Sequence, residues 1–334
     1  MELTTAAHDL LVFHDGHRVH RYEGLDPGRT YDYLGLESRT LDRPPGELLC
    51  RIATVNDVHF GEEECGRVDD HPQGPIQRRA PGETPYPEVM NTAAVLEMQA
   101  VEPAAVIVKG DLTNSGQPHE FGAFEAWYRT TFGDRLHVVR GNHDAYEGQH
   151  EYAGDRWIEV PGAAIALLDT VIPGKASGTL TTAQLDWLEH HAHASDVPVL
   201  VMGHHPQWID EGDNRRSDDY FGMHPDASDA LNDVVARCPR IVAYTAGHTH
   251  RHRIRRMTCG VPTIEIGCVK DFPGTWAEYR VFEGGITQVV HRMSTPDALE
   301  WSERCRHLYA DFGIDYESYA LGTLGERCCN IPLR

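Results

Sequence analysis

Residues 136–144 read LHVVRGNHD, a short apolar run that ends at a glycine and leads into three polar side chains. The β-branched run Leu136–Val139 predicts a buried strand. The loop after such a strand is where α/β proteins place their chemistry. Asn142 offers an oxygen to a metal or a phosphate, His143 offers a transferable proton, and Asp144 offers a carboxylate that would orient the histidine. The value of this short stretch depends on partners elsewhere in the chain.

Four further predicted strands end in the same way, with histidine or aspartate close behind the last apolar residue. They are Leu48–Val55 followed by Asp57 and His59, Ala105–Val108 followed by Asp111, Val197–Met202 followed by His204 and His205, and Ile241–Ala246 followed by His248 and His250. Each group has an ordinary explanation of its own, because loops are rich in polar residues and buried histidines are common. Five such groups, mostly beside glycines, are hard to attribute to chance. Because such strand ends lie along one edge of a sheet, the sequence predicts a metal site there.

The composition narrows the class of protein. The 334 residues are 40% hydrophobic and 24% charged, as in ordinary globular chains, and carry a formal net charge of −21. That charge disfavours binding to nucleic acid polymers or to anionic membranes. No apolar run has the length of a transmembrane helix, and the first residues lack the pattern of a signal peptide. The eight cysteines are scattered with no CxxC pair, which favours a reducing, cytoplasmic setting.

Three segments are expected along the chain. Residues 1–47 predict a small β extension, residues 48–291 the main domain, and residues 292–334 a tail. The extension should hold strands at Leu10–Phe13, Arg18–Tyr22 and Thr30–Leu34, with a hairpin turn at Asp15-Gly16. The tail should hold one helix near Ala298–Ala310 and then a loose end. We cannot assign a role to the pair Cys328-Cys329 from its sequence context.

Within the main domain, helices are expected at Glu88–Val101, at His119–Thr131, from Thr181 onward and at Ala227–Arg237. In the first of these, the residues Val89, Ala93, Leu96 and Ala100 share one face, which predicts a buried stripe. Thr181 and Gln184 have the spacing of a capping box. Strands between residues 253 and 291 are expected to be antiparallel. Two long loops, residues 62–87 and 207–224, follow strand ends and should overhang the metal site.

The full motif set resembles the calcineurin-like metallophosphoesterases. The matching residues are Asp57-x-His59, Gly110-Asp111, Gly141-Asn142-His143-Asp144, Gly203-His204 and Gly247-His248-x-His250, in this order. The resemblance implies an α/β fold in which a two-sheet β-sandwich is flanked by helices in four layers. It also implies that Asp57, His59 and His250 bind one metal ion, that Asn142, His204 and His248 bind a second, and that Asp111 bridges both. His143 would lie beside the site without binding metal, where its imidazole could protonate the leaving group. Asp144 either orients His143 or is a plain turn carboxylate, and His205 would lie behind the site or face the substrate.

The chemistry explains these residue types. A phosphodiester is anionic, so its hydrolysis needs charge neutralisation and a nucleophile at neutral pH. Two metal ions about 3.5–4 Å apart clamp phosphate oxygens and lower the pKa of bound water to about 7. Mixed nitrogen and oxygen ligands suit manganese or iron, with zinc as a further option. An imidazole that protonates the leaving alkoxide typically contributes about 10²–10⁴-fold in rate.

Residues 168–188 are similar to a segment of the bacterial class III cyclic-nucleotide phosphodiesterases and of the glycerophosphodiesterases. This resemblance narrows the range of expected substrates, but only by association with those families. The expected function is hydrolysis of a small phosphodiester, 3′,5′-cyclic AMP or another cyclic nucleotide. A broader glycerophosphodiesterase, or a phosphomonoesterase or protein phosphatase on the same site, is the enzymatic alternative. A metal-free scaffold of the same fold is the alternative from another class. The terminal extensions leave open whether the chain forms a homo-oligomer.

Overall fold

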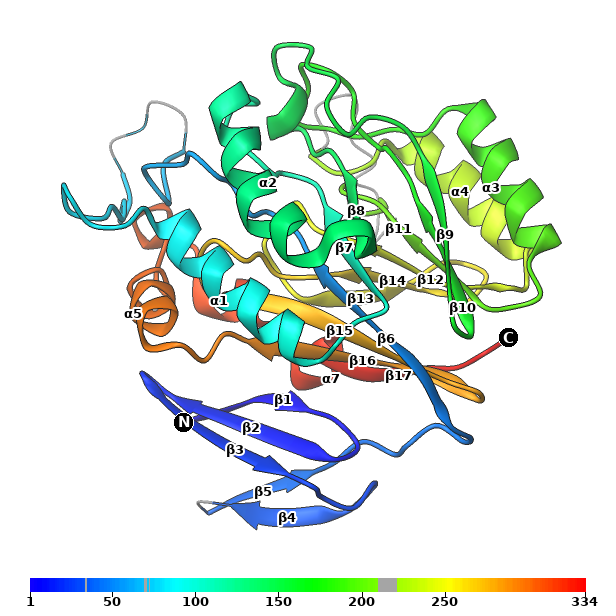
Figure 1. The fold of residues 1–334 in the computed structure, drawn as a ribbon, viewed down its shortest axis with the longest axis horizontal. Coiled ribbons are helices and arrows are strands. Elements are labelled where there is room, and N and C mark those ends of the chain that lie inside the picture. The colour runs from blue at the N-terminus through cyan, green and yellow to red at the C-terminus, as the bar shows by residue number, and fades with distance from the viewer. Residues whose placement is uncertain (34, 69–70, 72, 210–220) are drawn as a thin grey trace.

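Two six-stranded β-sheets lie face to face at the centre of the protein (Figure 1). The computed structural model describes residues 1–33, 35–68, 71, 73–209 and 221–334. One sheet runs in the order β13 (Arg253–Arg256), β14 (Pro262–Glu265), β12 (Ile241–Ala246), β11 (Val199–Met202), β10 (Ala163–Leu167) and β9 (Arg156–Val160). The other runs in the order β17 (Cys328–Ile331), β16 (Gly285–Arg292), β15 (Thr275–Phe282), β6 (Leu48–Val55), β7 (Ala105–Lys109) and β8 (Leu136–Val139).

The strands that lead into the polar loops are parallel to one another within each sheet, although β6 also pairs antiparallel with β15. β6, β7 and β8 form one parallel set, and β10, β11 and β12 form another. The predicted bounds of the five loop-bearing strands agree with the structure to within two residues. Such strands are buried on both faces, so they appear in the sequence as uninterrupted apolar runs. Their carboxyl ends share an edge within each sheet, as predicted.

Apolar side chains from both sheets fill the space between them. Ile52 and Ile107 of one sheet and Ile165, Leu200 and Ile264 of the other are fully buried in this common core. Full burial of a side chain of this size stabilises the fold by about 1.5–3 kcal/mol. A rigid sandwich core therefore fixes the positions from which the polar loops emerge.

Helices cover both outer faces of the sandwich (Figure 1). α1 (Tyr86–Ala100), α2 (Pro118–Phe132) and α5 (Pro296–Arg304) pack on the sheet that contains β6. α3 (Thr182–Ala194) and α4 (Pro225–Arg237) pack on the sheet that contains β12. α3 begins at the predicted capping box, since Thr181 and Gln184 each bond to the other's backbone N–H. The four-layer α/β arrangement is confirmed.

The predicted apolar face of α1 is only partly right, because Ala93 is buried but Leu96 and Ala100 are exposed. Leu96 is 56% exposed, whereas Met90, Ala94 and Met98 are buried. The helix packs against α2 and α5 as well as the sheet, so its buried arc is set by three neighbours rather than by its own apolar stripe. Local periodicity cannot show this arrangement.

Residues 1–41 contain five strands, two more than the three predicted for this part of the chain. β1 (Glu2–Ala6), β2 (Leu10–Asp15) and β3 (Arg18–Glu23) make an antiparallel sheet, and β4 (Thr30–Tyr33) pairs with β5 (Leu36–Arg39). The hairpin between β2 and β3 turns at Gly16, whose φ is +57°. The extension packs on Val289 and Cys328 of the main sheet.

The chain does not finish in a loose end, contrary to the prediction. After α5 come α6 (Tyr316–Leu321) and α7 (Leu324–Arg327), and the final strand β17 pairs antiparallel with β16. Cys328 and Cys329 begin this strand, and the Cys328 thiol lies 3.4 Å from the backbone N–H of Ala6. Cys328 therefore links the last strand to the first one, whereas Cys329 packs against the core between the two main sheets.

Two other strand predictions need correction. β14 lies between β12 and the edge strand β13, and it pairs parallel with β12 and antiparallel with β13. The strands from 253 to 291 are therefore not all antiparallel to their neighbours, contrary to the prediction. β9 was not predicted, because only one of its five residues, Ile158, is buried. Of the loop 207–224, residues 210–220 lie outside the described ranges.

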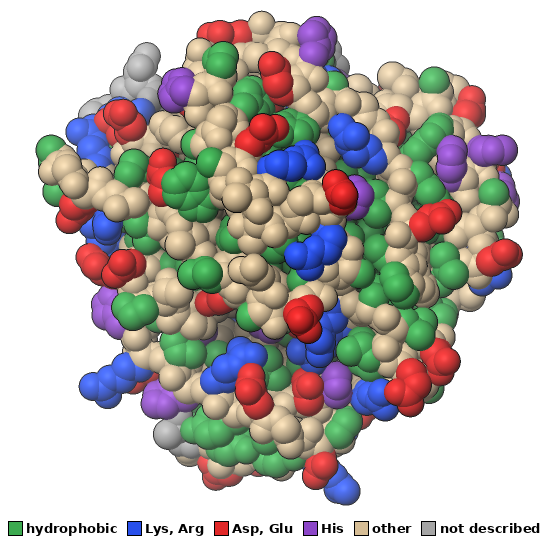
Figure 2. Space-filling model, viewed as in Figure 1, with side chains coloured by type: hydrophobic (Ala, Val, Ile, Leu, Met, Phe, Trp, Pro, Cys, Tyr) green, Lys and Arg blue, Asp and Glu red, His purple; other side chains and the backbone are tan. Residues whose placement is uncertain are grey.

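All eight cysteines fall within the described ranges, and none of them is in a disulfide. None of the helices in the described part of the chain has the length and apolar composition needed to cross a bilayer. Figure 2 shows acidic and basic side chains interspersed over one face of the protein, where they form no continuous basic stripe. That face therefore offers no extended cationic track of the kind that polyanions bind.

Candidate metal centre

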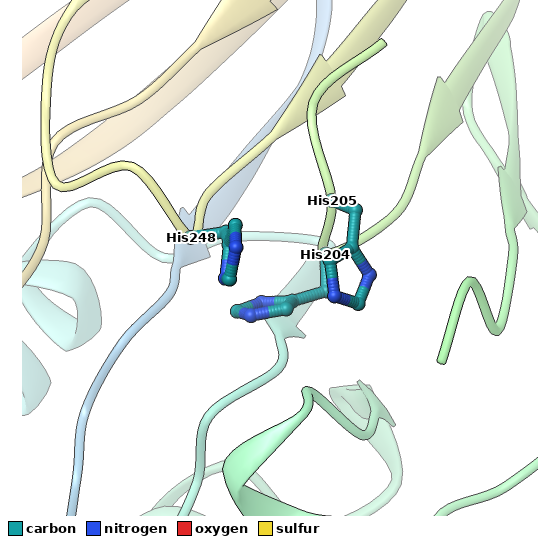
Figure 3. Close-up of side chains that lie close together, drawn as sticks. All are labelled: His204, His205 and His248. Atoms are coloured by element: carbon teal, nitrogen blue, oxygen red, sulfur yellow. The ribbon is translucent and has the colours of Figure 1, made fainter. Parts of the chain in front are cut away.

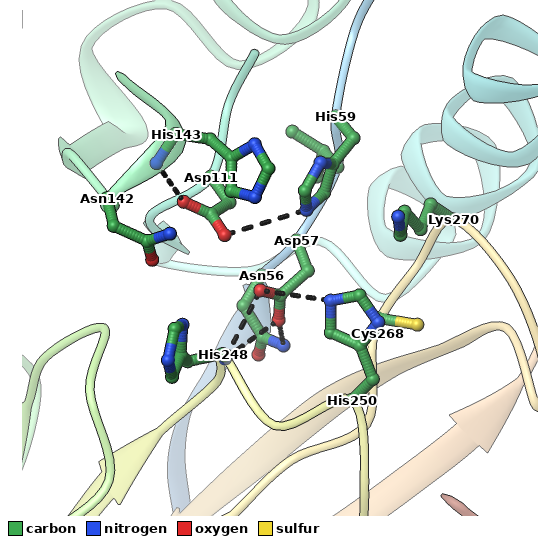
Figure 4. Close-up of polar contacts among 12 residues, drawn as sticks. Asn56, Asp57, His59, Asp111, Asn142, His143, His248, His250, Cys268 and Lys270 are labelled. Atoms are coloured by element: carbon green, nitrogen blue, oxygen red, sulfur yellow. Dashed lines mark hydrogen bonds and ion pairs between the residues drawn. The ribbon is translucent and has the colours of Figure 1, made fainter. Parts of the chain in front are cut away.

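The loops after β6, β7, β8, β11 and β12 bring all seven predicted metal ligands together, of which six are labelled in Figure 4 and His204 in Figure 3. They are Asp57 and His59, Asp111, Asn142, His204, and His248 with His250, named in the order of those strands. Six of the seven side chains are buried, and His250 is the partly exposed one. A cluster of this kind holds buried charge that needs a counterpart.

One group of ligands consists of Asp57, His59 and His250. Their ligand atoms all lie within 4.8 Å of one another. The Nε2 atom of His250 lies 3.6 Å from Oδ1 of Asp57. The carboxylate of Asp57 also accepts the backbone N–H of His248 and the side-chain N–H of Asn56. Two carboxylate oxygens are thus held in place from the side opposite the imidazoles.

A second group consists of Asn142, His204 and His248. The Nε2 atom of His204 lies 3.0 Å from Oδ1 of Asn142, and the rings of His204 and His248 are 5.0 Å apart. The Nδ1–H of His204 donates to the carbonyl of Lys109 at 2.8 Å, which leaves its Nε2 lone pair for a ligand. The Nε2–H of His248 donates to the carbonyl of Phe221 at 2.7 Å, which leaves its Nδ1. A carbonyl can only accept a hydrogen bond, so it fixes each tautomer.

The carboxylate of Asp111 lies between the two groups. Its Oδ2 is 3.5 Å from Nε2 of His59 and 3.2 Å from Nε2 of His204. Its Oδ1 accepts the backbone N–H of His143 at 3.0 Å. Burial opposes ionisation of Asp111, but His204 and His143 hold its pKa well below the usual range. Asp111 and Asp57 raise the pKa of buried His204 to about 9, against the effect of burial. The carboxylates of Asp111 and Asp57 therefore attract positive charge to the region between the two ligand groups.

Glycines before the ligands allow the loops to approach one another. A Cβ at Gly110 would lie 2.5 Å from Nδ1 of His204, and a Cβ at Gly141 would lie 2.2 Å from Oδ1 of Asp111. Real side chains do not tolerate such distances. These two glycines are therefore needed for space, whatever their backbone angles.

The backbone of the site is strained in a consistent way. Asp57, His59, Asp111, His248 and His250 have φ values of 55°, 47°, 52°, 69° and 53°, in the left-handed region. They make up five of the eight non-glycine residues with positive φ in the described ranges. Each such residue costs about 1–2 kcal/mol. Strain of this kind clusters at sites where function requires the conformation.

The residues present fit metal ions. Both ring nitrogens of His59 are buried and have no hydrogen-bond partner among the described residues. Buried polar atoms without partners are rare in native proteins and mark positions where a ligand belongs. The donor set of imidazole nitrogens and carboxylate and amide oxygens suits manganese, iron or zinc. The site could therefore hold two ions of this class.

Comparisons with known proteins agree with this geometry. The sequence model described as calcineurin-like phosphoesterase matches residues 50–252. The chain belongs to this family. The matched region of the phosphoesterase contains all seven candidate ligands and His143.

Curated relatives are similar over part of their length. The phosphoesterase is 28% identical over 172 residues to a Synechococcus protein named "Probable cyclic nucleotide phosphodiesterase", covering 50% of this chain and 64% of that one. It is 30% identical over 126 residues to the cAMP/cGMP dual specificity phosphodiesterase of Mycobacterium tuberculosis, covering 33% and 39%. It is 29% identical over 168 residues to a glycerophosphodiester phosphodiesterase of Enterobacter lignolyticus, covering 44% and 56%. The chain thus spans less than two thirds of each of these relatives.

Solved structures share the fold. A dimetal phosphatase of Danio rerio superposes with a TM-score of 0.57 at 15% identity, covering 74% of this chain and 97% of that one. A purple acid phosphatase of yellow lupin gives 0.51 at 11% identity, covering 83% and 60%. At these identities the likeness establishes the architecture of the phosphoesterase and nothing finer.

His143 of the phosphoesterase lies beside the candidate ligands. Its Nδ1–H donates to the carbonyl of Asn114 at 2.7 Å, and its ring is 4.6 Å from that of His59. The ring is half-buried and lines the cleft, so Nε2 is the nitrogen left for a substrate. Asn114 thus orients the ring.

The expectation that Asp144 orients His143 is wrong. The buried carboxylate of Asp144 accepts the backbone N–H groups of Leu112, Thr113 and Gly141 and the hydroxyl of Thr113, at 2.6–3.0 Å. These contacts join the loop after β7 to the loop after β8. Asp144 therefore braces the backbone that carries Asp111. Its adjacency to His143 in sequence suggested a contact that the turn does not make.

His205 lies directly behind the second group (Figure 3). Its ring is 4.9 Å from that of His204 and 4.7 Å from that of His248. Its Nδ1 lies 2.7 Å from the hydroxyl of Thr170, and its buried Nε2 has no hydrogen-bond partner in the part of the chain that the structure describes. Burial and the neighbouring histidines hold its pKa well below the usual range, so the ring is neutral.

A cleft of about 760 Å³ opens beside the metal centre. Its aromatic lining consists of Tyr146, Phe221, Tyr309, Tyr316 and Tyr319. The last three come from the C-terminal segment, which sequence reasoning treated as a tail outside the site. Part of the loop 62–87 also lines the cleft, through residues 66–68, so that loop adjoins the site as expected. A repeated tyrosine spacing in residues 309–319 was the one available signal for this wall.

Proposed function

We propose that the chain is a two-metal phosphodiesterase that hydrolyses small phosphodiesters, with 3′,5′-cyclic nucleotides as its substrates. The observation that carries the proposal is the position of Asp111, whose carboxylate lies within 3.5 Å of a histidine from each ligand group. A carboxylate in that position can bind an ion on either side. The membership of the chain in a phosphoesterase family and its phosphodiesterase-named relatives support the reaction class.

One ion would be held by Asp57, His59 and His250, and the other by Asn142, His204 and His248. Asp111 would bind both ions. His204 and His248 would each contribute the ring nitrogen that its hydrogen bond to a backbone carbonyl leaves free. Two such ions neutralise the phosphate and make water nucleophilic near neutral pH. Manganese and iron are the proposed occupants.

His143 is the proposed general acid. Its Nδ1–H bond to the carbonyl of Asn114 persists in both protonation states, so the ring keeps one orientation. In the protonated ring the second proton sits on Nε2 and is delivered to the leaving oxygen. The neutral ring that remains is then reprotonated from water in the open cleft.

The aromatic lining of the cleft supports a cyclic nucleotide as substrate. A nucleobase stacks on aromatic rings, with about 1–3 kcal/mol per base in single-strand binding proteins. Tyr319 is 37% exposed and Phe221 is 52% exposed, so both offer free ring surface in this chain. A glycerophosphodiester has an aliphatic alcohol and gains no stacking. It remains the second candidate because one relative carries that name.

The test is a substrate screen with metal analysis of the same preparation. Purified protein is loaded with Mn²⁺ and assayed on cyclic AMP, cyclic GMP, a glycerophosphodiester and p-nitrophenyl phosphate. We expect hydrolysis of the diesters, abolished by chelation and restored by Mn²⁺. The double variant His204→Ala/His248→Ala should lose one ion and the activity.

His193→Ala is the matched control, because His193 belongs to a separate group with Glu189 and Cys238 near the surface. It should keep both ions and the full rate. Full activity in the double variant would overturn the two-metal proposal, and a preference for the monoester would redirect it to a phosphomonoesterase. A folded protein that binds no Mn²⁺ would indicate a scaffold.

Eight free thiols favour a reducing compartment for this enzyme, and we propose the cytoplasm.

A further inference from the structure

A fully buried carboxylate, Asp271, faces His250 from behind the metal centre. Its Oδ2 lies 3.3 Å from Nδ1 of His250. On the other side of the same imidazole, Nε2 lies 3.6 Å from Oδ1 of Asp57. The ring of His250 therefore spans the distance between a candidate ligand carboxylate and a second carboxylate that lies outside the ligand set.

Neutral donors surround the rest of the Asp271 carboxylate. The hydroxyl of Tyr316 donates to Oδ1 at 2.7 Å, and the thiol of Cys268 donates to the same oxygen at 3.0 Å. The thiol of Cys65 lies 3.7 Å from Oδ2. All three donors are buried. Both oxygens are thus engaged, so the carboxylate cannot rotate freely.

The His250–Cys268–Asp271 group has its ligand atoms within 4.8 Å, which is also the spacing of a metal site. Hydrogen-bond donors, however, already fill the positions around Asp271 that an ion would need. A carboxylate can only accept, so the Nδ1–H of His250 donates to Asp271, and the Nε2 lone pair is left for an ion that would lie between His250 and Asp57. These contacts favour a supporting carboxylate over a third metal site.

α6 braces the same loop from the C-terminal segment. The hydroxyl of Tyr319 donates to the carbonyl of Thr249 at 3.0 Å, and the backbone N–H of His252 donates to the carbonyl of Ala320 at 3.0 Å. Together with the Tyr316 hydroxyl, these bonds attach α6 to both sides of His250. The family match ends at residue 252, so α6 and Asp271 are features of this chain beyond the matched region.

We propose that Asp271 is a positioning residue for His250, and that Tyr316 of α6 holds Asp271 in the orientation this requires. The carboxylate accepts Nδ1–H, which fixes the tautomer, directs Nε2 at the ion and raises the basicity of the ring. The C-terminal segment thereby sets how tightly the Asp57–His59–His250 group binds metal. This inference rests on the two-metal centre proposed above.

The test is Asp271→Asn, with Mn²⁺ binding measured by calorimetry on the metal-free protein. A carboxamide has one acceptor oxygen, so either His250 or Tyr316 loses its partner. We expect one of the two binding constants to weaken by about 10–100-fold while the other stays unchanged. In protein loaded with Co²⁺, the visible ligand-field spectrum of one ion should change. Tyr316→Phe, which removes a single hydroxyl, should weaken the same constant to a smaller degree.

Glu278→Gln is the matched control, because Glu278 is also fully buried but pairs with Arg51 and Arg280 in the sheet. It should lower the melting temperature and leave both binding constants unchanged. If the wild-type chain binds fewer than two ions, the metal-centre proposal itself fails. If the wild-type chain binds two and Asp271→Asn binds both with wild-type constants, only the role of Asp271 is overturned. If Asp271→Asn does not fold, an unchanged constant in Tyr316→Phe overturns the inference equally.

Discussion

Gly141 allows the closest approach between two loops of the metal centre, so adding a single methyl group there tests the geometry. In Gly141→Ala the new Cβ would lie 2.2 Å from Oδ1 and 2.3 Å from the backbone N of Asp111. Carbon atoms rarely approach such atoms within 3.0 Å, so the two loops must separate by about 0.7–0.8 Å. The backbone N cannot rotate away as a side chain can. The carboxylate between the two ligand groups therefore moves.

A displacement of the Asp111 carboxylate by this distance should lower the rate of hydrolysis. We expect kcat/KM for a diester such as bis-p-nitrophenyl phosphate to fall about 10²-fold, the typical effect of a misplacement near 1 Å. Overpacking should also lower the free energy of unfolding by about 1–3 kcal/mol. Steady-state assays at saturating Mn²⁺ and urea unfolding of the metal-free protein measure the two effects separately.

Gly122→Ala is the matched control, because a Cβ at Gly122 in α2 meets nothing within 4 Å. It should keep the wild-type rate and gain about 0.5–1 kcal/mol in stability, since alanine favours a helix. Wild-type kcat/KM in Gly141→Ala would refute the reasoning. It would mean that the position of Asp111 relative to the loop after β8 does not matter.

Three other changes test separate parts of the site and the fold. His143→Ala should keep both ions but lose about 10²–10⁴-fold in kcat, more for alkoxide than for p-nitrophenolate leaving groups, and equal losses would contradict the acid role. Phe221→Ala removes an exposed ring but keeps the backbone carbonyl that accepts from His248, so it should raise KM for cyclic AMP several-fold and leave a glycerophosphodiester unaffected; equal effects would argue against stacking. Burial opposes ionisation of Glu278, but His291 and Arg280 lower its pKa to about 2. Because that pKa is depressed, Glu278 stabilises the fold above pH 4.5 and the contribution is lost as pH falls towards 2, by up to about 3 kcal/mol. Urea unfolding across this range should show a steep acid limb that Glu278→Gln flattens, and an unchanged limb would refute the assignment.

The part of the fold that carries the site was predictable because its signals are local. Strands such as Leu136–Val139 are buried on both faces, so each appears as an apolar run with an abrupt polar end. The ligands follow those ends directly, which fixes their place in the fold without any knowledge of side-chain contacts. The candidate ligands and His143 could be located in this way, whereas their separation from Asp144 and His205 depended on the resemblance to the family.

The rest depends on contacts between distant parts of the chain. β9 and β17 are edge strands with few buried residues, so their sequence carries little periodicity. The role of Asp144 is set by donors about 30 residues earlier, and Asp271 is held by a tyrosine 45 residues later. The local sequence shows none of these contacts. The prediction of the buried face of α1 failed for the same reason, because that face is set by distant neighbours.

The left-handed backbone of five ligands has a consequence for how the protein matures. At about 1 kcal/mol or more for each residue, the site stores roughly 5 kcal/mol, comparable to the whole stability of many domains. Bound ions stabilise only the folded chain, so their arrival offsets this cost. A newly synthesised chain is then nearest to its unfolding threshold while it waits for metal. Under the two-metal proposal, we therefore expect expression without added Mn²⁺ to yield more proteolysed protein than expression with it.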